Sequence, residues 1–422
     1  MLAKNQKYIL GLALAVFFSF SGYFVGRSGY TLKRVGGGEK GKVVISREIP
    51  GRYEGVNFSL FWEVWDRLAN SYVDEAAVNQ TNMVYGAIAG MVNSLGDPYT
   101  VFLTPSENKN VNEDLGGAFE GVGIQLGFTE EKKLSVTSPL EGSPAAKAGV
   151  KAGDVIVNIK DEKAGIDKDT YGITLPEAVQ LIRGTRGTVV TLTLEREGKE
   201  DPLVVNLKRE TIVVKSVSLI YKNLAGGSDS QVAVLKLNKF GGRTENEWVE
   251  AVDKIDKEFR KGKVRAMVLD LRNNPGGYLD QSVWMASEFI KDGVVVKQQG
   301  RNGRDDKIFD VVRDGGLLEI PLVVLVNGGS ASAAEILAGA LKEHGRATLV
   351  GEKTFGKGTV QQPEDLAGGA GLHITIARWL LPSGAWIDGK GVEPDVTVKN
   401  DEDEVLDEQL EAGIERLKSL VE

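Results

Sequence analysis

The chain has 422 residues, of which 42% are hydrophobic and 26% charged, a length and composition typical of two or three globular domains. Its formal net charge of −8 argues against a nucleic-acid-binding protein, which needs a basic face to neutralise phosphates. The sequence has no cysteine, which excludes disulfides, thiolate metal sites and a cysteine nucleophile. It has only two histidines, which disfavours a histidine-based metal site. We therefore expect neither a metal nor a cofactor.

The N-terminus contains an uncharged apolar run, residues 8–26, that follows Lys4 and Lys7 and precedes Arg27. This run is longer than the apolar core of a typical cleaved signal peptide, although cleavage stays an open alternative. The sequence predicts a single-pass membrane anchor within residues 1–30. Lys4 and Lys7 then stay cytoplasmic, and the rest of the chain lies in the periplasm or at the cell exterior.

The next two regions differ in periodicity. Residues 31–56 contain three consecutive glycines and Pro50 without a repeating apolar pattern, which predicts a flexible linker. Residues 57–113 carry apolar side chains at helical spacing and form a predicted helical region. Their aromatic stripe is typical of core packing or of a subunit contact.

The rest of the chain divides into three further regions. Residues 114–212 contain short β-rich runs around one helical stretch and predict a compact, mainly β domain. Residues 213–400 alternate strands with helices and predict an α/β core whose strand-to-loop junctions carry the chemistry. Residues 401–422 carry apolar residues on one helical face, which predicts a docked C-terminal helix. The terminal helices are candidate contacts of a homo-oligomer.

Ser332 lies at a predicted strand-to-helix turn, between the apolar run at residues 322–326 and a helix that opens with Ala333. Unpaired N–H groups at the start of a helix can hold a developing oxyanion, and Ala333 supplies the nearest one. The alternative is structural, because Ser332 and Glu335 have the spacing of a capping box that only satisfies the helix terminus.

Lys357 follows a glycine-rich stretch, residues 351–356, with the spacing of a phosphate-binding loop. Gly358 stands where such a loop needs serine or threonine, and the following residues predict a strand, so nucleotide binding is disfavoured. Burial between the flanking glycines would lower the pKa of Lys357 and make it a general base for a serine hydroxyl. An exposed lysine on a glycine turn is the competing interpretation.

A third strand, residues 269–272, leads into a Pro-Gly-Gly turn. Such a turn exposes backbone N–H groups, so Gly276 or Gly277 could supply the second oxyanion donor beside Ala333. An ordinary tight turn is the alternative.

Five segments in this order resemble the C-terminal processing, or tail-specific, proteases over residues 57–399. The segments are Leu-Gly-Asp-Pro-Tyr-Thr at 95–100, Asp-Leu-Arg-Asn-Asn-Pro-Gly-Gly at 270–277, Asn-Gly-Gly-Ser-Ala-Ser-Ala-Ala-Glu at 327–335, Gly-Glu-Lys-Thr-Phe-Gly-Lys-Gly-Thr-Val-Gln at 351–361 and Gly-Val-Glu-Pro-Asp at 391–395. The resemblance implies an α/β protease core of crotonase-like or ClpP-like ββα units. It also implies an inserted, mainly β PDZ domain, beside the N-terminal helical region and the transmembrane anchor.

The same resemblance implies a serine endopeptidase that cleaves at or near exposed C-termini of extracytoplasmic proteins with a serine/lysine dyad. The family nucleophile falls on Ser332 rather than Ser330, and the base falls on Lys357. Gln361 matches the glutamine that orients this lysine. Ala334 departs from the pattern, since the family often has another serine there.

The mainly β domain resembles the PDZ domains of bacterial proteases through residues 142–154. Gly-x-Gly-apolar is the form of a carboxylate-binding loop, whose N–H groups can capture the free C-terminus of a peptide with apolar residues. The loop residues are Gly121, Val122, Gly123 and Ile124. The segment 161–172 is longer than the usual hairpin. Arg183 resembles a family arginine that couples tail binding to activation.

Two other functions remain as alternatives. A catalytically inactive PDZ scaffold would be expected to lack Ser332 or Lys357, and both are present. A Ser/His hydrolase needs His344 or His373 near the serine. His344 lies at the far end of the predicted helix, about 18 Å away at ~1.5 Å per residue, and His373 lies in an apolar strand pattern.

Overall fold

The computed structural model describes residues 30–35, 42–47, 57–224, 230–400 and 406–421. It divides into two compact units, Met1–Gly86 and Ala87–Glu422. The predicted anchor at residues 8–26 lies outside the described residues. Within the described ranges, no helix has both the length and the apolar character needed to cross a membrane.

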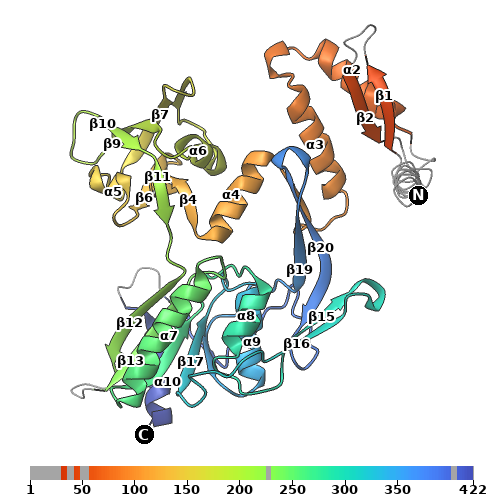
Figure 1. The fold of residues 1–422 in the computed structure, drawn as a ribbon. Coiled ribbons are helices and arrows are strands. Elements are labelled where there is room, and N and C mark those ends of the chain that lie inside the picture. The colour runs from red at the N-terminus through yellow and green to blue at the C-terminus, as the bar shows by residue number, and fades with distance from the viewer. Residues whose placement is uncertain (1–29, 36–41, 48–56, 225–229, 401–405, 422) are drawn as a thin grey trace, which may run out of the picture. The chain divides into compact units, whose positions relative to one another are not determined.

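The first described residues of the first unit form two paired strands where the sequence predicts a linker. β1 (Tyr30–Val35) pairs antiparallel with β2 (Lys42–Arg47) (Figure 1), so the linker prediction for residues 31–56 is wrong at these strands. The glycine run at residues 36–38 suggested a spacer, but β-branched and aromatic residues on either side of it favour extended backbone. η2 (Glu75–Ala77) follows later in the same unit.

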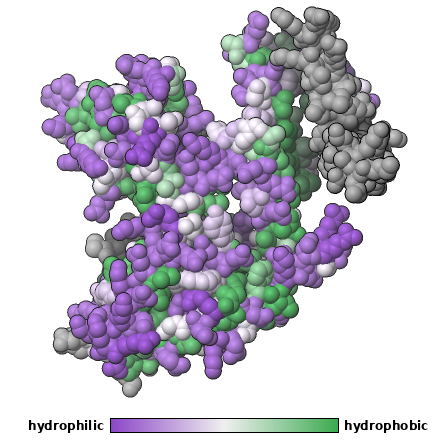
Figure 2. All heavy atoms as spheres, viewed as in Figure 1, coloured by the Kyte–Doolittle hydropathy of each residue, from purple (hydrophilic) through white to green (hydrophobic). Residues whose placement is uncertain are grey.

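Helix α2 (Ser59–Ser71) carries the predicted aromatic stripe but buries none of its residues. Phe58 is 47% exposed, Trp62 56% and Leu68 47%, so the stripe does not enter a core within a single chain. Helix α3 (Gln80–Asn93) follows, and hydrophobic spheres gather along this part of the chain in the view of Figure 2.

The second unit begins at Ala87, within α3, and continues with a short strand and a helix. β3 (Val101–Leu103) leads into α4 (Pro105–Gly116), which starts at a capping box between Thr104 and Glu107. The helix ends at Gly117, whose φ of 72° is the left-handed conformation that favours glycine at a helix C-terminus.

The mainly β domain follows α4 and has its own hydrophobic core. Its sheet has the strand order β10-β9-β7-β6-β5, and β8 pairs with β7 beyond this path. β4 and β11 form a separate pair that leads the chain into and out of the domain. The elements are β4 (Ala118–Gly121), β5 (Ile124–Phe128), β6 (Leu134–Pro139), α5 (Pro144–Lys147), β7 (Val155–Asp161), β8 (Ile166–Asp169), α6 (Leu175–Ile182), β9 (Val189–Glu195), β10 (Leu203–Lys208) and β11 (Glu210–Val213). Strand β8 accounts for the extra length at residues 161–172.

The α/β core is built on a second sheet of order β12-β13-β14-β17-β18-β21, in which only the β12–β13 pair is antiparallel. Buried side chains fill strands β14 and β17, as expected for parallel strands covered on both faces. The elements of this layer are β12 (Val217–Asn223), β13 (Gln231–Leu237), α7 (Thr244–Arg260), β14 (Val264–Asp270), α8 (Leu279–Ala286), β17 (Leu322–Val326), α9 (Ala333–Glu343), β18 (Thr348–Gly351), β21 (Val396–Thr397) and α10 (Glu408–Val421).

A third sheet of order β16-β15-β20-β19 lies beside this core, and β3 adds to β20. Its elements are β15 (Val294–Gly300), η3 (Arg301–Gly303), β16 (Lys307–Asp310), β19 (Thr359–Asp365), η4 (Ala367–Gly369) and β20 (Gly371–Leu380). Helix α10 docks by its apolar face, as the sequence predicts, because Leu410, Ile414 and Leu417 pack in one cluster with core-strand residues such as Val323 and Leu325. The α/β core and the embedded β domain therefore match the predicted fold class.

Candidate active site

Ser332 lies at the turn between β17 and α9, in a conformation unusual for a residue with a side chain. Its φ is 55° and its ψ is −117°, and such strain persists only where the surroundings fix it. Ser330, two residues earlier, is fully buried and provides part of this support. Its hydroxyl donates to the carbonyl of Leu271 at 2.9 Å and accepts the N–H of Asn327 at 3.0 Å. Ser332 is partly exposed, so it is the more accessible of the two serines.

The Pro-Gly-Gly turn packs directly against this serine. A Cβ at Gly276 would lie 2.8 Å from the Cβ of Ser332 and 3.0 Å from the nitrogen of Ala333, so only glycine fits. The Gly276 N–H donates to the side-chain oxygen of Asn274 at 2.9 Å and is already satisfied. The N–H groups of Gly277 and Ala333 have no hydrogen-bond partner among the described residues. Of the three predicted oxyanion donors, these two are free.

The buried carboxylate of Glu335 joins the serine turn to the lysine loop. It accepts the N–H of Ser332 at 2.8 Å, of Gly356 at 2.6 Å and of Lys357 at 2.9 Å. The hydroxyl of Thr354 donates a fourth hydrogen bond at 2.6 Å. The sequence indicates only the capping bond to Ser332. The sequence signal for further hydrogen bonds was that Glu335 is the one charged residue between Ala333 and Leu341, since a buried charge needs several donors.

Lys357 precedes β19 and is partly buried. Burial lowers the pKa of its ammonium, while the carboxylates of Asp97 and Glu335 act in the opposite direction. Its Nζ lies 4.8 Å from the centre of the Tyr99 ring. Between the described side chains of Lys357 and Ser332 there is no hydrogen bond. A strand follows the lysine instead of a helix, in agreement with the prediction against a phosphate-binding loop.

Among the described residues, Gln361 makes no hydrogen bond to Lys357. Its amide nitrogen donates to the hydroxyls of Thr359 at 2.9 Å and Thr375 at 3.2 Å. The groups that face the lysine are instead Tyr99 and Asp97, from the segment before β3.

The pKa of Asp97 is lowered overall. Burial raises it, but hydrogen bonds from Thr100 and Thr375 and from the backbone of Tyr99 outweigh that effect, with help from the charge of Lys357. Residues 95–100, which include Asp97 and Tyr99, are one of the five segments of the family resemblance, but the sequence indicated no role for them.

The two histidines make no hydrogen bond to Ser332 in the described part of the chain. His344 caps the far end of α9, where its ring nitrogen Nε2 lies 2.8 Å from the carbonyl of Val294. His373 lies in β20 opposite Val101, and burial, followed by the charge of Lys357, lowers its pKa.

The predicted carboxylate-binding loop connects β4 with β5. The N–H groups of Val122 and Gly123 have no partner among the described residues, whereas Gly121 ends β4 and Ile124 begins β5. Gly123 has a φ of 74°, and a Cβ there would lie 2.3 Å from the Cβ of Ser143. The loop therefore presents unpaired donors on a backbone that only glycine permits.

Arg183 directly follows α6 of the β domain. Its guanidinium donates to the carboxylate of Asp114 on α4 at 2.9 Å and lies 4.3 Å from the centre of the Phe119 ring. The residue thus connects the β domain to the helix that precedes it.

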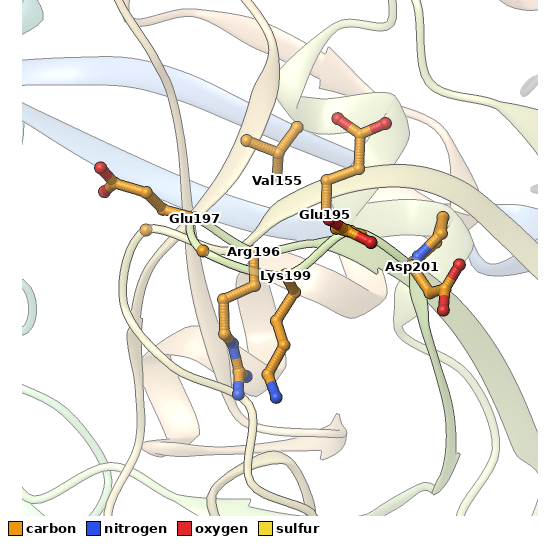
Figure 3. Close-up of a pocket in the computed structure, with 10 residues that line it drawn as sticks. Val155, Glu195, Arg196, Glu197, Lys199 and Asp201 are labelled. Atoms are coloured by element: carbon orange, nitrogen blue, oxygen red, sulfur yellow. The ribbon is translucent and has the colours of Figure 1, made fainter.

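The hollow in Figure 3 lies elsewhere in the β domain and contains none of the predicted site residues. Arg196, which lines it, is held by the buried carboxylate of Asp154 through two hydrogen bonds of 2.6 and 2.8 Å, and by the carbonyl of Gly149. Because its guanidinium is engaged in these hydrogen bonds, Arg196 stabilises the β domain.

Family comparisons agree with this architecture. A model described as Peptidase family S41 matches residues 231–398, one described as PDZ domain matches residues 135–196, and one described as Activating protease CtpB N-terminal domain matches residues 40–106. An α/β core with a serine at a strand-to-helix turn and a PDZ domain beside it defines a PDZ-containing serine peptidase.

Individual relatives cover most of the chain. A carboxy-terminal-processing protease of Bartonella bacilliformis is 37% identical over 339 residues, which are 80% of this chain and 74% of the relative. The carboxy-terminal processing protease CtpA of Bacillus subtilis is 36% identical over 79% of this chain and 67% of the relative. The solved photosystem II D1 C-terminal processing protease is 30% identical with a TM-score of 0.51, over 85% of this chain and 96% of that one. The chain belongs to the family of carboxy-terminal processing serine peptidases, as its motifs predict.

Glu335→Gln is expected to lower the free energy of unfolding by about 3 kcal/mol, because an amide presents donors to groups that donate to the carboxylate. Peptidase activity should fall with it, since Ser332 and Lys357 lose their common acceptor. Urea unfolding and cleavage assays of the full chain measure both effects. Glu343→Gln is the matched control, as Glu343 lies on the same helix, is exposed and accepts its hydrogen bonds from Ser383 alone among the described residues, away from Ser332 and Lys357. Equal stability and activity of the two variants would contradict the role given to Glu335.

Proposed function

We propose that the chain cleaves at or near exposed C-termini of extracytoplasmic proteins with a dyad of Ser332 as nucleophile and Lys357 as general base. The observation that carries this proposal is the arrangement around Glu335. A strained, partly exposed serine lies against a turn in which the N–H of Gly277 has no partner among the described residues. One buried carboxylate accepts hydrogen bonds from the backbone of this serine and from that of a lysine whose pKa burial lowers.

In the proposed reaction, neutral Lys357 takes the proton of the Ser332 hydroxyl as the oxygen attacks the scissile carbonyl. The negative charge that develops on the carbonyl oxygen is stabilised by the N–H groups of Gly277 and Ala333, which are unpaired before substrate arrives. The protonated lysine then returns its proton to the leaving amine. Water, activated by the same lysine, hydrolyses the acyl-enzyme.

The lysine must turn towards the serine for this reaction, because its Nζ lies over the Tyr99 ring in this structure. Catalytic hydrogen bonds are often long or absent before substrate binds, so this geometry is compatible with the dyad. We propose that Gln361 helps to hold the lysine after it turns, since it lies on the strand that begins two residues beyond Lys357.

Substrate recruitment is assigned to the PDZ domain. The unpaired N–H groups of Val122 and Gly123 suit a peptide carboxylate, and the peptide can add as a strand beside β5. We further propose that Arg183 transmits occupancy of this loop through its ion pair with Asp114.

The remaining proposals concern location and assembly. We propose domain limits at residues 1–30, 31–56, 57–113, 114–212, 213–400 and 401–422, with the paired strands β1 and β2 inside the second segment except for Tyr30. An anchor within residues 1–30 would hold the peptidase at the membrane with its catalytic body outside the cytoplasm. The exposed aromatic stripe of α2 supports a homo-oligomer.

Ser332→Ala is expected to abolish peptide cleavage without loss of structure, because it removes one partly exposed hydroxyl. Ser330→Ala should lower the melting temperature, since it removes two buried hydrogen bonds, but should retain cleavage of folded enzyme. Rates normalised to the folded fraction separate the two variants. Cleavage lost in Ser330→Ala and kept in Ser332→Ala would show that the nucleophile has been misassigned.

The pH profile tests the base. A neutral lysine is the active form, so kcat/KM should rise with pH through the pKa of Lys357. Because burial lowers that pKa, the rise should be centred below the ordinary lysine value of 10.5. Lys357→Arg should be as inactive as Lys357→Ala, since a guanidinium keeps its charge. His344→Ala and His373→Ala are the controls, and loss of activity in either folded histidine variant would favour a Ser/His mechanism.

Tail recognition is tested with the inactive full-length Ser332→Ala protein. An apolar peptide with a free C-terminus should bind at least about tenfold more tightly than the same peptide with a C-terminal amide, because the amide loses charge-assisted hydrogen bonds to the loop. Titration calorimetry measures both affinities. Equal binding of the two peptides would rule out the carboxylate-binding role of residues 121–124.

A further inference from the structure

Helix α4 contacts the strands that follow the proposed base through Asn108. This side chain is 7% exposed and donates to the carboxylate of Asp365 at 3.0 Å and to the carbonyl of Gly369 at 3.2 Å. A Cβ at Gly371 would lie 2.3 Å from the side-chain oxygen of Asn108, so only glycine at this position lets the strand pass so close to α4. Asp365 ends β19 and Gly371 begins β20, so Asn108 binds the tip of the β19–β20 hairpin.

The segment before α4 contacts the same hairpin nearer to the lysine. Strand β3 pairs with β20, and the hydroxyl of Thr100 accepts the N–H of Thr375 at 3.0 Å. The hydroxyl of Thr375 in turn accepts the amide of Gln361, four residues beyond Lys357. Residues 97–108 therefore form a continuous contact along the hairpin, from Asn108 at its tip to the side chains that face the lysine.

The other end of α4 contacts the loop that supports the oxyanion turn. The carbonyl of Leu115 accepts the N–H of Gly242 at 2.8 Å, and Lys239 donates to the carbonyl of Asp114. Phe240, within this loop, donates its N–H to the carbonyl of Gly276 at 2.9 Å, and its carbonyl accepts the N–H of Tyr278 at 3.0 Å. The loop and the oxyanion turn are thus joined through their backbones.

We propose that α4 is a strut that sets the distance between the base strand and the oxyanion turn, and that Asn108 is its positioning residue at the base end. This inference rests on the proposed function. The helix is closed at both ends, by the capping box at Thr104 and by Gly117, which suits a rigid connector. The base and the oxyanion donors lie on separate elements of the core. A connector that contacts both supports limits how far each can move relative to the other.

The chain offers a matched pair of substitutions on one helix. Asn108→Ala should lower kcat at least about tenfold with little change in KM, because small displacements of catalytic groups cost rate more than binding. Asn112→Ala changes the same residue type on the exposed face of α4 and should behave as the unsubstituted chain. Both variants should bind the free-acid peptide equally, since neither residue belongs to the carboxylate-binding loop.

Two further variants keep the test decisive if Asn108→Ala unfolds. Asp365→Ala removes one acceptor from an exposed position and should lower kcat in the same direction. Asn108→Asp places two carboxylates together and should lower kcat further than Asn108→Ala. Combining it with Asp365→Asn restores the hydrogen bond between the two side chains, although not the one to Gly369, and should recover part of kcat. Recovery of the melting temperature without recovery of kcat would indicate a purely structural contact and overturn the inference.

The outcomes also separate this inference from the proposed function. If Ser332→Ala is inactive while folded Asn108→Ala and Asp365→Ala keep the kcat of Asn112→Ala, the strut is wrong and the dyad stands. If Ser332→Ala remains active, the dyad itself is wrong and the inference falls with it.

Discussion

The candidate active site depends on one buried carboxylate, that of Glu335. A charge removed from water must find donors within the protein, and this one takes all four from the serine turn and the lysine loop. Three of those donors are backbone N–H groups, whose positions fix the path of the chain. The hydrogen bonds to this carboxylate therefore also set the position of the Ser332 backbone relative to that of Lys357. The two residues lie 25 positions apart in the sequence and in different loops.

The strain at Ser332 follows from this constraint and from its neighbours. A positive φ is costly for a residue with a Cβ, and here it is held by the hydrogen bonds of Ser330 and by Gly276, which packs against the turn. The result leaves the hydroxyl of Ser332 accessible and the N–H groups of Gly277 and Ala333 without a partner in the part of the chain that the structure describes. Donors that are fixed and unsatisfied before substrate binds need no reorganisation when negative charge develops.

The PDZ domain and the α/β core are separate parts of the second unit, and both contact helix α4. Asp114 on that helix binds Arg183 of the PDZ domain through its carboxylate and Lys239 of the core through its carbonyl. Burial lowers the pKa of Lys239, and its position beside Arg183 adds to this effect, while Asp114 opposes it. The charges of Arg183 and Asp114 therefore lie beside the loop that contacts the Pro-Gly-Gly turn. These contacts make α4 the natural place to look for communication between the PDZ domain and the α/β core.

The sequence by itself determined the main element types of the PDZ domain and of the protease core, and the family, but it missed the strands β1, β2 and β3. It determined these features through local signals: apolar periodicity, glycines that only certain turns permit, and five ordered motifs. It could not show that the N–H of Gly276 is occupied by Asn274, that Gln361 contacts threonines, or that Tyr99 and Asp97 face Lys357. It also could not reveal the four hydrogen bonds that Glu335 accepts, or the hydrogen bond from Asn108 to Asp365, which lies 257 positions away. The tertiary structure decided these because hydrogen-bond partners distant along the chain depend on how the sheets and loops pack, which no local pattern encodes.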